Sequence, residues 1–129
     1  MKQMIGAVAL LVPDYDAAIA FYVGQLGFDL VEDTHLSETK RWVRVAPRGS
    51  TEARLLLARA DNDEQSAAIG NQAGGRVLLF LNTDDFDRDH AAMVSEGVSF
   101  LESPRVEEYG KVAVFKDPFG NKWDLIEHY

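Results

Sequence analysis

The sequence predicts an α+β protein made of two consecutive modules, each with the order β-α-β-β-β. The main evidence is an internal repeat. Asp14-Tyr15-Asp16 follows an apolar run and precedes a helical pattern, and Asp85-Phe86-Asp87 does the same 71 positions later. Leu26-Gly27-Phe28 is matched in the same way by Glu96-Gly97-Val98, with 70 positions between the two glycines. A repeat that covers half of the chain is too long for a solenoid unit and indicates a duplicated module.

The length of 129 residues suits one compact domain. We therefore predict a single domain over residues 1–129, with the first module at 1–60, a linker at 61–75 and the second module at 76–129. A module of that size buries proportionally little apolar surface alone, so we expect the two modules to share one core.

The first module opens with an apolar strand over residues 4–12, which Pro13 ends because proline cannot donate to a strand ladder. Asp14 or Asp16 can cap the helix that follows, and Gly27 fits the C-terminal cap of that helix. Further strands are predicted at 28–32, 41–46 and 53–58, with a polar loop at 33–39 and a turn at 47–50 between them.

The segment 60–75 is polar and glycine-rich, and we interpret it as a mobile linker with room for one helical turn. The second module then repeats the order of the first. Its predicted elements are a strand at 76–82, a helix at 85–96, a strand at 98–101, a polar loop at 103–109, a strand at 110–116, a tight turn at 117–121 and a last strand at 122–128.

The composition narrows the possible partners. The net charge of −8 argues against nucleic acid, because binding a phosphate backbone requires a basic surface. No apolar run approaches the roughly 20 residues of a membrane span, and the first residues lead into a strand without a signal peptide, so we expect a cytoplasmic protein with no membrane partner. The absence of cysteine removes thiolate chemistry and cysteine-based zinc sites.

Specific motifs add a family resemblance. The residues from Val12-Pro13-Asp14 through Phe21-Tyr22 to Leu26-Gly27-Phe28, and the ending Asp117-Pro118-Phe119-Gly120-Asn121 with its following strand, resemble the vicinal oxygen chelate superfamily. That group contains glyoxalases, bleomycin-resistance proteins and extradiol dioxygenases. The resemblance implies a cup-shaped mixed sheet, with helices outside and a ligand on the concave side. It also implies a homodimer.

The resemblance further implies four metal-ligand positions, which we compared with this sequence. They fall on Ala7, Leu78, Asp124 and either Arg54 or Leu56. Only Asp124 offers a donor atom, and one donor does not hold a divalent cation. None of the three histidines has a partner at a spacing suited to metal. We therefore expect neither the metal centre nor any other cofactor.

Asp124 is the leading candidate for binding or catalysis, as an acceptor for a ligand cation or as a base. The alternative is that Asp124 only pairs with a neighbouring arginine, such as Arg54. Tyr109 could close over a ligand. If the strand 41–46 lies on the concave side, Trp42 would offer a ring for stacking and Arg44 a guanidinium that binds anions. The predicted ligand-binding set is Trp42, Arg44, Arg54, Leu78, Phe80, Tyr109 and Asp124, with no metal ligand.

The leading hypothesis is a protein of the bleomycin-resistance type that binds a small cationic or aromatic molecule in a cup without a metal. Whether it also catalyses a reaction stays open. One alternative is a metal-dependent glyoxalase-like lyase or dioxygenase with atypical ligands. Another is a structural module whose cup is filled by its own side chains.

Overall fold

The computed structural model describes residues 1–129 and divides the chain into two compact units, Met1–Ile69 and Gly70–Tyr129. The division falls inside the predicted linker 61–75. That segment contains the helix α2 (Asp63–Ala68), which begins after Asn62. The side chain of Asn62 accepts a hydrogen bond of 2.8 Å from the amide of Gln65 and so caps the helix. None of the helices is long and apolar enough to cross a membrane.

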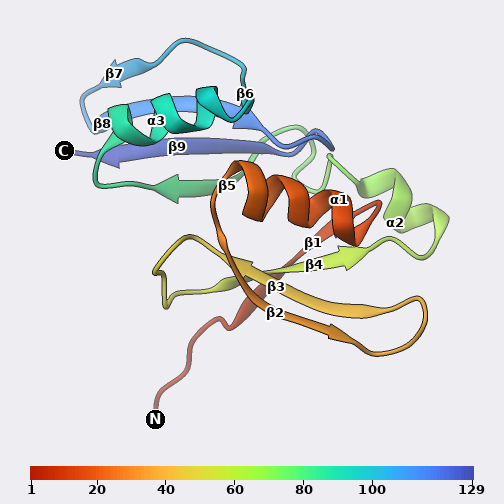
Figure 1. Ribbon diagram of the computed structural model, residues 1–129. Coiled ribbons are helices and arrows are strands. Elements are labelled where there is room, and N and C mark those ends of the chain that lie inside the picture. The colour runs from red at the N-terminus through yellow and green to blue at the C-terminus, as the bar shows by residue number, and fades with distance from the viewer. The chain divides into compact units, whose positions relative to one another are not determined.

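The first unit is a four-stranded mixed sheet with one main helix (Figure 1). The sheet order is β1-β4-β3-β2, with β1 parallel to β4 and the other pairs antiparallel. The helix α1 continues directly into a π-helical segment, η1. The bounds are β1 (Ala7–Val12), α1 (Tyr15–Ile19), η1 (Ala20–Gln25), β2 (Asp29–His35), β3 (Arg41–Ala46) and β4 (Arg54–Arg59).

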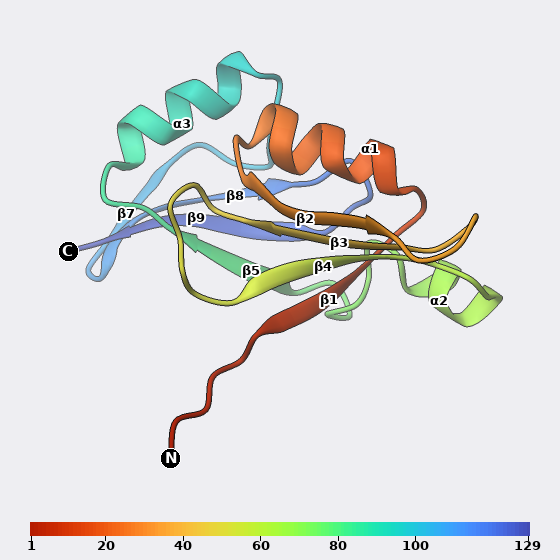
Figure 2. The same ribbon diagram turned by 60° about the horizontal axis from the view of Figure 1, so that its bottom comes forward.

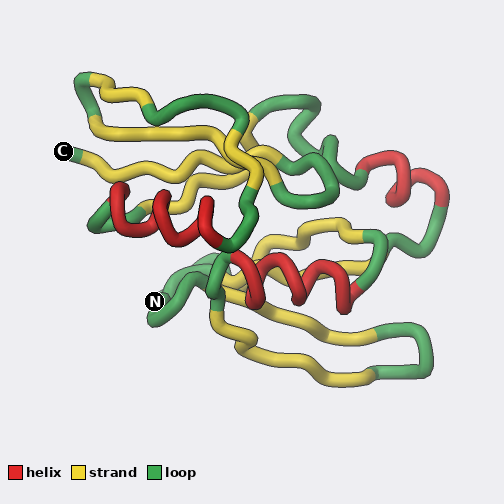
Figure 3. Tube along the Cα trace, turned by 45° about the horizontal axis from the view of Figure 1, so that its top comes forward, coloured by secondary structure: helices red, strands yellow, loops and turns green.

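The second unit repeats this topology. Its sheet order is β5-β9-β8-β6, with β5 parallel to β9, and the short strand β7 also pairs with β8. In each unit a helix lies along one side of the strands (Figures 2 and 3). The bounds are β5 (Val77–Asn82), α3 (Phe86–Ser95), β6 (Ser99–Phe100), β7 (Arg105–Glu107), β8 (Gly110–Lys116) and β9 (Lys122–His128). Two βαβββ modules with mixed sheets, as predicted, are therefore confirmed.

The residues that revealed the repeat have the same roles in both units. Asp14 accepts a hydrogen bond of 2.8 Å from the Ala17 amide, and Asp85 accepts one of 3.1 Å from the Arg88 amide, so each aspartate caps its helix. Gly27 and Gly97 follow the helices with φ of 76° and 86°. Asp16, the other predicted cap, forms an ion pair with Arg41 instead.

Two segments predicted as polar loops contain strand. β2 extends to His35. Within it, the Asp33 carboxylate accepts hydrogen bonds from Arg41 Nε at 3.1 Å and from Arg41 Nη2 at 2.6 Å. β7 occupies Arg105–Glu107 within the loop predicted at 103–109. In both places charged side chains form ion pairs with one another, so a strand carries residues that are typical of loops.

The core of the second unit is aromatic. Rings lie at successive centroid distances of 5.4, 4.4, 5.6 and 5.8 Å along the series Phe86, His90, Phe100, Phe115 and Trp123. Burial of one such large side chain contributes roughly 1.5–3 kcal/mol. The series joins α3 to one face of the sheet and therefore fixes which residues of β9 point toward the helix.

The turn before β9 sets the position of the candidate site. Asp117 is buried and accepts hydrogen bonds from the amides of Phe119 and Asn121 at 3.0 and 2.8 Å, and from the Asn121 side chain at 2.7 Å. Gly120 has a φ of 104°, which other residues rarely adopt. This tight turn fixes where Lys122 starts and hence the register of the whole strand.

Candidate functional site

The site lies on the face of the second sheet opposite α3. Glu127 accepts a hydrogen bond of 2.7 Å from the amide of Phe86, the first residue of α3. Because side chains alternate along a strand, Asp124 lies on the other face. Asp124 stands in register with Phe80 on β5 and with Val114 on β8. Neighbouring strands are about 4.8 Å apart, so this row spans about 10 Å.

Asp124 has one oxygen without a partner. Its Oδ1 is buried from solvent and accepts no hydrogen bond. Burial raises the pKa of Asp124 above its usual range; the charge of Arg105 opposes this shift, and the charge of Glu102 adds to it. A buried acceptor that lacks a donor costs about 1–3 kcal/mol. A titratable group held in such an environment is a candidate for a functional residue.

Two predicted apolar residues of β5 lie in different settings. Phe80 is 62% exposed and stands directly beside Asp124 in register. Leu78 falls at an irregularity between Val77 and Leu79, where the pairing with β9 shifts by one residue. Such a bulge redirects a side chain. The simple alternation that placed Leu78 and Phe80 together therefore does not describe this strand.

Asp124 interacts electrostatically with a charged cluster of Glu102, Arg105 and Glu107, of which the sequence reasoning missed Glu102 and Arg105. The Arg105 guanidinium donates to Glu102 through Nε at 2.7 Å and to Glu107 through Nη1 at 2.8 Å. The second oxygen of Glu102 accepts from the Val114 amide at 2.9 Å. The Arg105 hydrogen bond lowers the pKa of Glu102, burial opposes this, and the Val114 amide lowers it further. The hydroxyl oxygen of Tyr109, a residue that is 51% exposed, also accepts a hydrogen bond from Arg105.

One sequence signal could have revealed this cluster: the charges alternate in sign at Glu102, Arg105 and Glu107. By itself that pattern is common on protein surfaces. What distinguishes it here is the Val114 amide, which takes Glu102 as its partner at the edge of β8. That contact depends on the register between segments that are distant in the sequence.

On β3, the predicted site residues lie on the face of the sheet that points away from the core of the first unit. Val43 and Val45 are buried, and Trp42 and Arg44 alternate with them along β3. Trp42 is 39% exposed, and Arg44 pairs with Glu32 at 3.0 Å. This pairing leaves Arg44 less available as an anion clamp than the sequence suggested.

Arg54 is engaged with its own turn. Its Nη1 donates to the carbonyl oxygens of Ser50 and Glu52, at 3.1 and 2.6 Å. The pairing of Arg54 with Asp124 stays a prediction; within the second unit, the charge of Arg105 acts on Asp124.

The donor atoms do not fit a metal centre. The structure contains no group of three or more His, Asp or Glu side chains placed to hold an ion. Ala7, at one predicted ligand position, stands in register with Arg54, and neither is a metal ligand. Glu102, the acidic side chain that acts on Asp124, already binds Arg105 and the Val114 amide.

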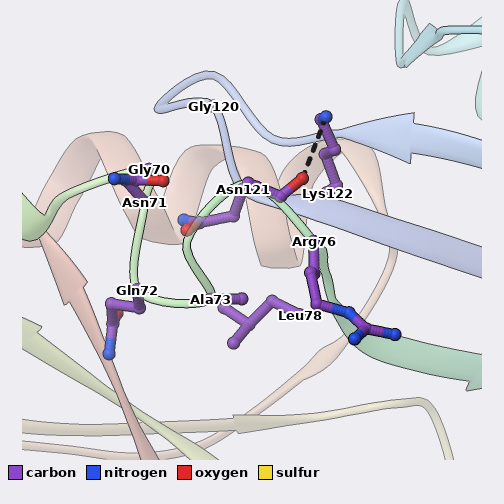
Figure 4. Close-up of a pocket in the computed structure, with 10 residues that line it drawn as sticks. Gly70, Asn71, Gln72, Ala73, Arg76, Leu78, Gly120, Asn121 and Lys122 are labelled. Atoms are coloured by element: carbon purple, nitrogen blue, oxygen red, sulfur yellow. Dashed lines mark hydrogen bonds between the residues drawn. The ribbon is translucent and has the colours of Figure 1, made fainter.

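A separate hollow with a cavity volume of about 30 Å³ lies between the segment 70–76 and the start of β9 (Figure 4). Lys122 points toward the Gly75 carbonyl and donates to it at 3.1 Å, and the Arg76 guanidinium points away from the turn (Figure 4). Leu78 also lines this hollow. Ligand pockets usually enclose about 300–1,000 Å³. The hollow is smaller, and its lysine is already bonded, so we place the candidate site at Asp124.

Comparisons with known proteins agree with the fold and the motifs. The sequence pattern of the Glyoxalase/Bleomycin resistance protein/Dioxygenase superfamily matches residues 4–125. An uncharacterized protein from Shewanella frigidimarina (strain NCIMB 400) is 58% identical over 128 residues, covering 98% of this chain and 95% of that protein.

Solved structures give the same result. The crystal structure of UcmS2 is similar with a TM-score of 0.84 and 27% identity, over 98% of both chains. TnmS3, an antibiotic binding protein from Streptomyces sp. CB03234, has a TM-score of 0.78 and 30% identity, over 99% of this chain and 98% of that one. The chain therefore belongs to the glyoxalase, bleomycin resistance and dioxygenase group, the vicinal oxygen chelate superfamily.

Proposed function

We propose that this protein binds a small organic cation with an aromatic body, at the face of the second sheet around Asp124. The observation that carries the proposal is the buried Oδ1 of Asp124, which has no hydrogen-bond donor and stands beside the exposed ring of Phe80. A ligand cation at the half-buried carboxylate would offset its charge, and the ring would supply an apolar and π-rich surface.

The charges around Asp124 favour a cation over an anion. Asp124, Glu102 and Glu107 are acidic, and Arg105 is the basic residue that bonds to two of them. A charged donor also forms a stronger hydrogen bond with a carboxylate than a neutral donor does. The net charge of −8 on the whole chain attracts cations from a distance.

The comparisons support binding as the type of activity. TnmS3 is described as an antibiotic binding protein, and it shares 30% of its aligned residues with this chain. The family alone does not decide between binding and catalysis, because one fold serves many functions. The lack of a fitting donor set for a metal supports binding over the metal-dependent reactions that the sequence kept as alternatives.

A matched pair of probes tests the proposal. 9-Aminoacridine is a planar cation at neutral pH, and acridine is the neutral molecule with the same ring system. Fluorescence titration should show that the protein binds the cation more tightly, by about tenfold, which is the worth of one charge-assisted hydrogen bond. A panel of further cationic and neutral aromatic compounds in thermal-shift assays should find stabilising ligands among the cations.

Two variants locate the binding. Asp124→Asn should remove the preference for the cation, because the acceptor loses its charge. Asp84→Asn makes the same chemical change at an exposed carboxylate that pairs with Arg88, and it should leave binding unchanged. Equal affinity of the wild-type protein for both probes, or no binding across the panel, would refute the proposal.

A further inference from the structure

The charge of Arg105 acts on Asp124, and two carboxylates hold the Arg105 guanidinium in place. We propose that Arg105 is a positioning residue, which Glu102 and Glu107 hold so that the half-buried carboxylate of Asp124 stays free of an ion pair and can meet the ligand. This inference rests on the proposed function, since it explains how the acceptor at that site is kept vacant. Arg105 itself is not expected to contact the ligand.

The geometry forms a continuous chain of contacts that ends beside Asp124. Val114 stands in register with Asp124, and its amide donates to Glu102 Oε2 at 2.9 Å. Glu102 Oε1 accepts from Arg105 Nε at 2.7 Å, and Glu107 accepts from Arg105 Nη1 at 2.8 Å. Glu102 precedes β7 in the sequence, and Glu107 is the last residue of β7.

The register places Arg105 on the same face of the sheet as Asp124. Arg105 pairs with Val112 on β8, and Val112 pairs with Ile126 on β9, two residues beyond Asp124. The charge of Arg105 already acts on Asp124, yet Asp124 Oδ1 receives no hydrogen bond. An arginine that could turn freely would form an ion pair with this carboxylate, because bidentate pairs of this kind are favourable. The bonds to Glu102 and Glu107 prevent that turn.

The consequence is selectivity. A freely turning Arg105 would compete with a cationic ligand for Asp124, whereas a neutral ligand would be affected little. A held Arg105 leaves the acceptor open and also satisfies Glu102, which then supports the edge of β8. The arrangement therefore predicts that the cluster sets the preference for cations without touching them.

Charge-conserving variants separate this role from a simple effect of net charge. Arg105→Lys keeps the positive charge, but a single ammonium group cannot reproduce the fork that binds two carboxylates. We expect the affinity for 9-aminoacridine to fall about fivefold, the worth of an ion pair near the surface, with the affinity for acridine unchanged. If only the charge of Arg105 mattered, neither affinity would change.

A second variant and a matched control accompany this measurement. Glu107→Asp also conserves charge, and its shorter side chain withdraws from Nη1, so the same selective loss is expected. Arg88 on α3 is bound by two carboxylates in the same way, at 2.8 and 2.9 Å, and Arg88→Lys should leave both affinities unchanged. A loss in the Arg88 variant equal to that in the Arg105 variant would refute the inference.

A measurement without ligand distinguishes this inference from the proposed function. Hydrogen exchange of the Val114 amide, followed by NMR, should be faster in Arg105→Lys than in the wild-type protein, because Glu102 is then held less firmly. Unchanged exchange in Arg105→Lys would overturn the inference even if cations bind. Faster exchange together with a lack of binding to any probe would instead defeat the proposed function and, with it, the role of Arg105 in selectivity.

Discussion

Phe80 and Asp124 stand opposite each other on the parallel strands β5 and β9, one with its ring largely exposed and the other with an oxygen that lacks a donor. Neither feature stabilises the folded chain by itself, since an exposed ring gains little from burial and an unsatisfied buried acceptor costs free energy. Their position side by side is the basis of the proposed binding site.

The pH dependence of stability should reveal the strain at Asp124. Burial raises its pKa, so folding favours the neutral carboxyl, and this contribution is lost as the pH rises through the pKa of the folded state. Asp124→Asn removes a charge that the fold disfavours. We therefore expect its Tm to exceed that of the wild-type protein at neutral pH, with the difference shrinking in acid. A lower Tm at neutral pH, with the fold intact, would contradict this account.

Glu102 should show the opposite behaviour. The Arg105 hydrogen bond lowers its pKa, although burial opposes this. The carboxylate thus contributes stability that is present above the pKa of the unfolded chain and is lost as the pH falls through the lower pKa of the folded state. Glu102→Gln should flatten the decrease of Tm between neutral and acid pH. A profile parallel to that of the wild-type protein would show that Glu102 contributes nothing to acid denaturation.

Much of the fold could be predicted because the signals were local. Alternating apolar residues bounded by turn residues placed β3, β8 and β9 with their observed ends. Asp14, one of the two caps considered for the first helix, followed from the preference of helix N-termini for side-chain acceptors. These features depend on residues within a few positions of one another, and a sequence displays them directly.

The parts that could not be predicted depend on contacts between distant residues. Two of the three residues of β7 are charged, and Arg105 pairs with carboxylates on both sides of it in the sequence, Glu102 and Glu107. The bulge at Leu78 depends on how β5 meets β9. Asp124 could be selected from its motif, but its lack of a donor appears only when all of its neighbours are placed. Glu102 was missed for the same reason, since its partner is the amide of Val114.

Close backbone approach makes two glycines irreplaceable. A Cβ atom at Gly70, where φ is 74°, would lie 2.0 Å from the Phe119 carbonyl oxygen. A Cβ atom at Gly110 would lie 2.2 Å from the backbone carbonyl oxygen of Glu127. Gly70→Ala and Gly110→Ala should each destabilise the fold by more than about 2 kcal/mol in urea denaturation. Gly24 in η1 has no atom within 4 Å of such a Cβ, and Gly24→Ala should stabilise the fold or leave it unchanged. Equal losses at all three positions would contradict the steric explanation.

Removal of metal gives the last prediction. Because the structure contains no set of donors suited to an ion, binding of 9-aminoacridine should not depend on one. Protein treated with a strong chelator and then dialysed should retain the same Tm and the same affinity for the probe. Addition of Zn²⁺, Ni²⁺ or Mn²⁺ should not raise the Tm, since a metal that bound the native site would stabilise the folded state by mass action. A loss of probe binding on chelation that one of these metals restores would contradict the proposal. It would instead point to a centre in which Asp124 serves as a ligand, and the vacancy of its Oδ1 would then be the place of the ion rather than of an organic cation.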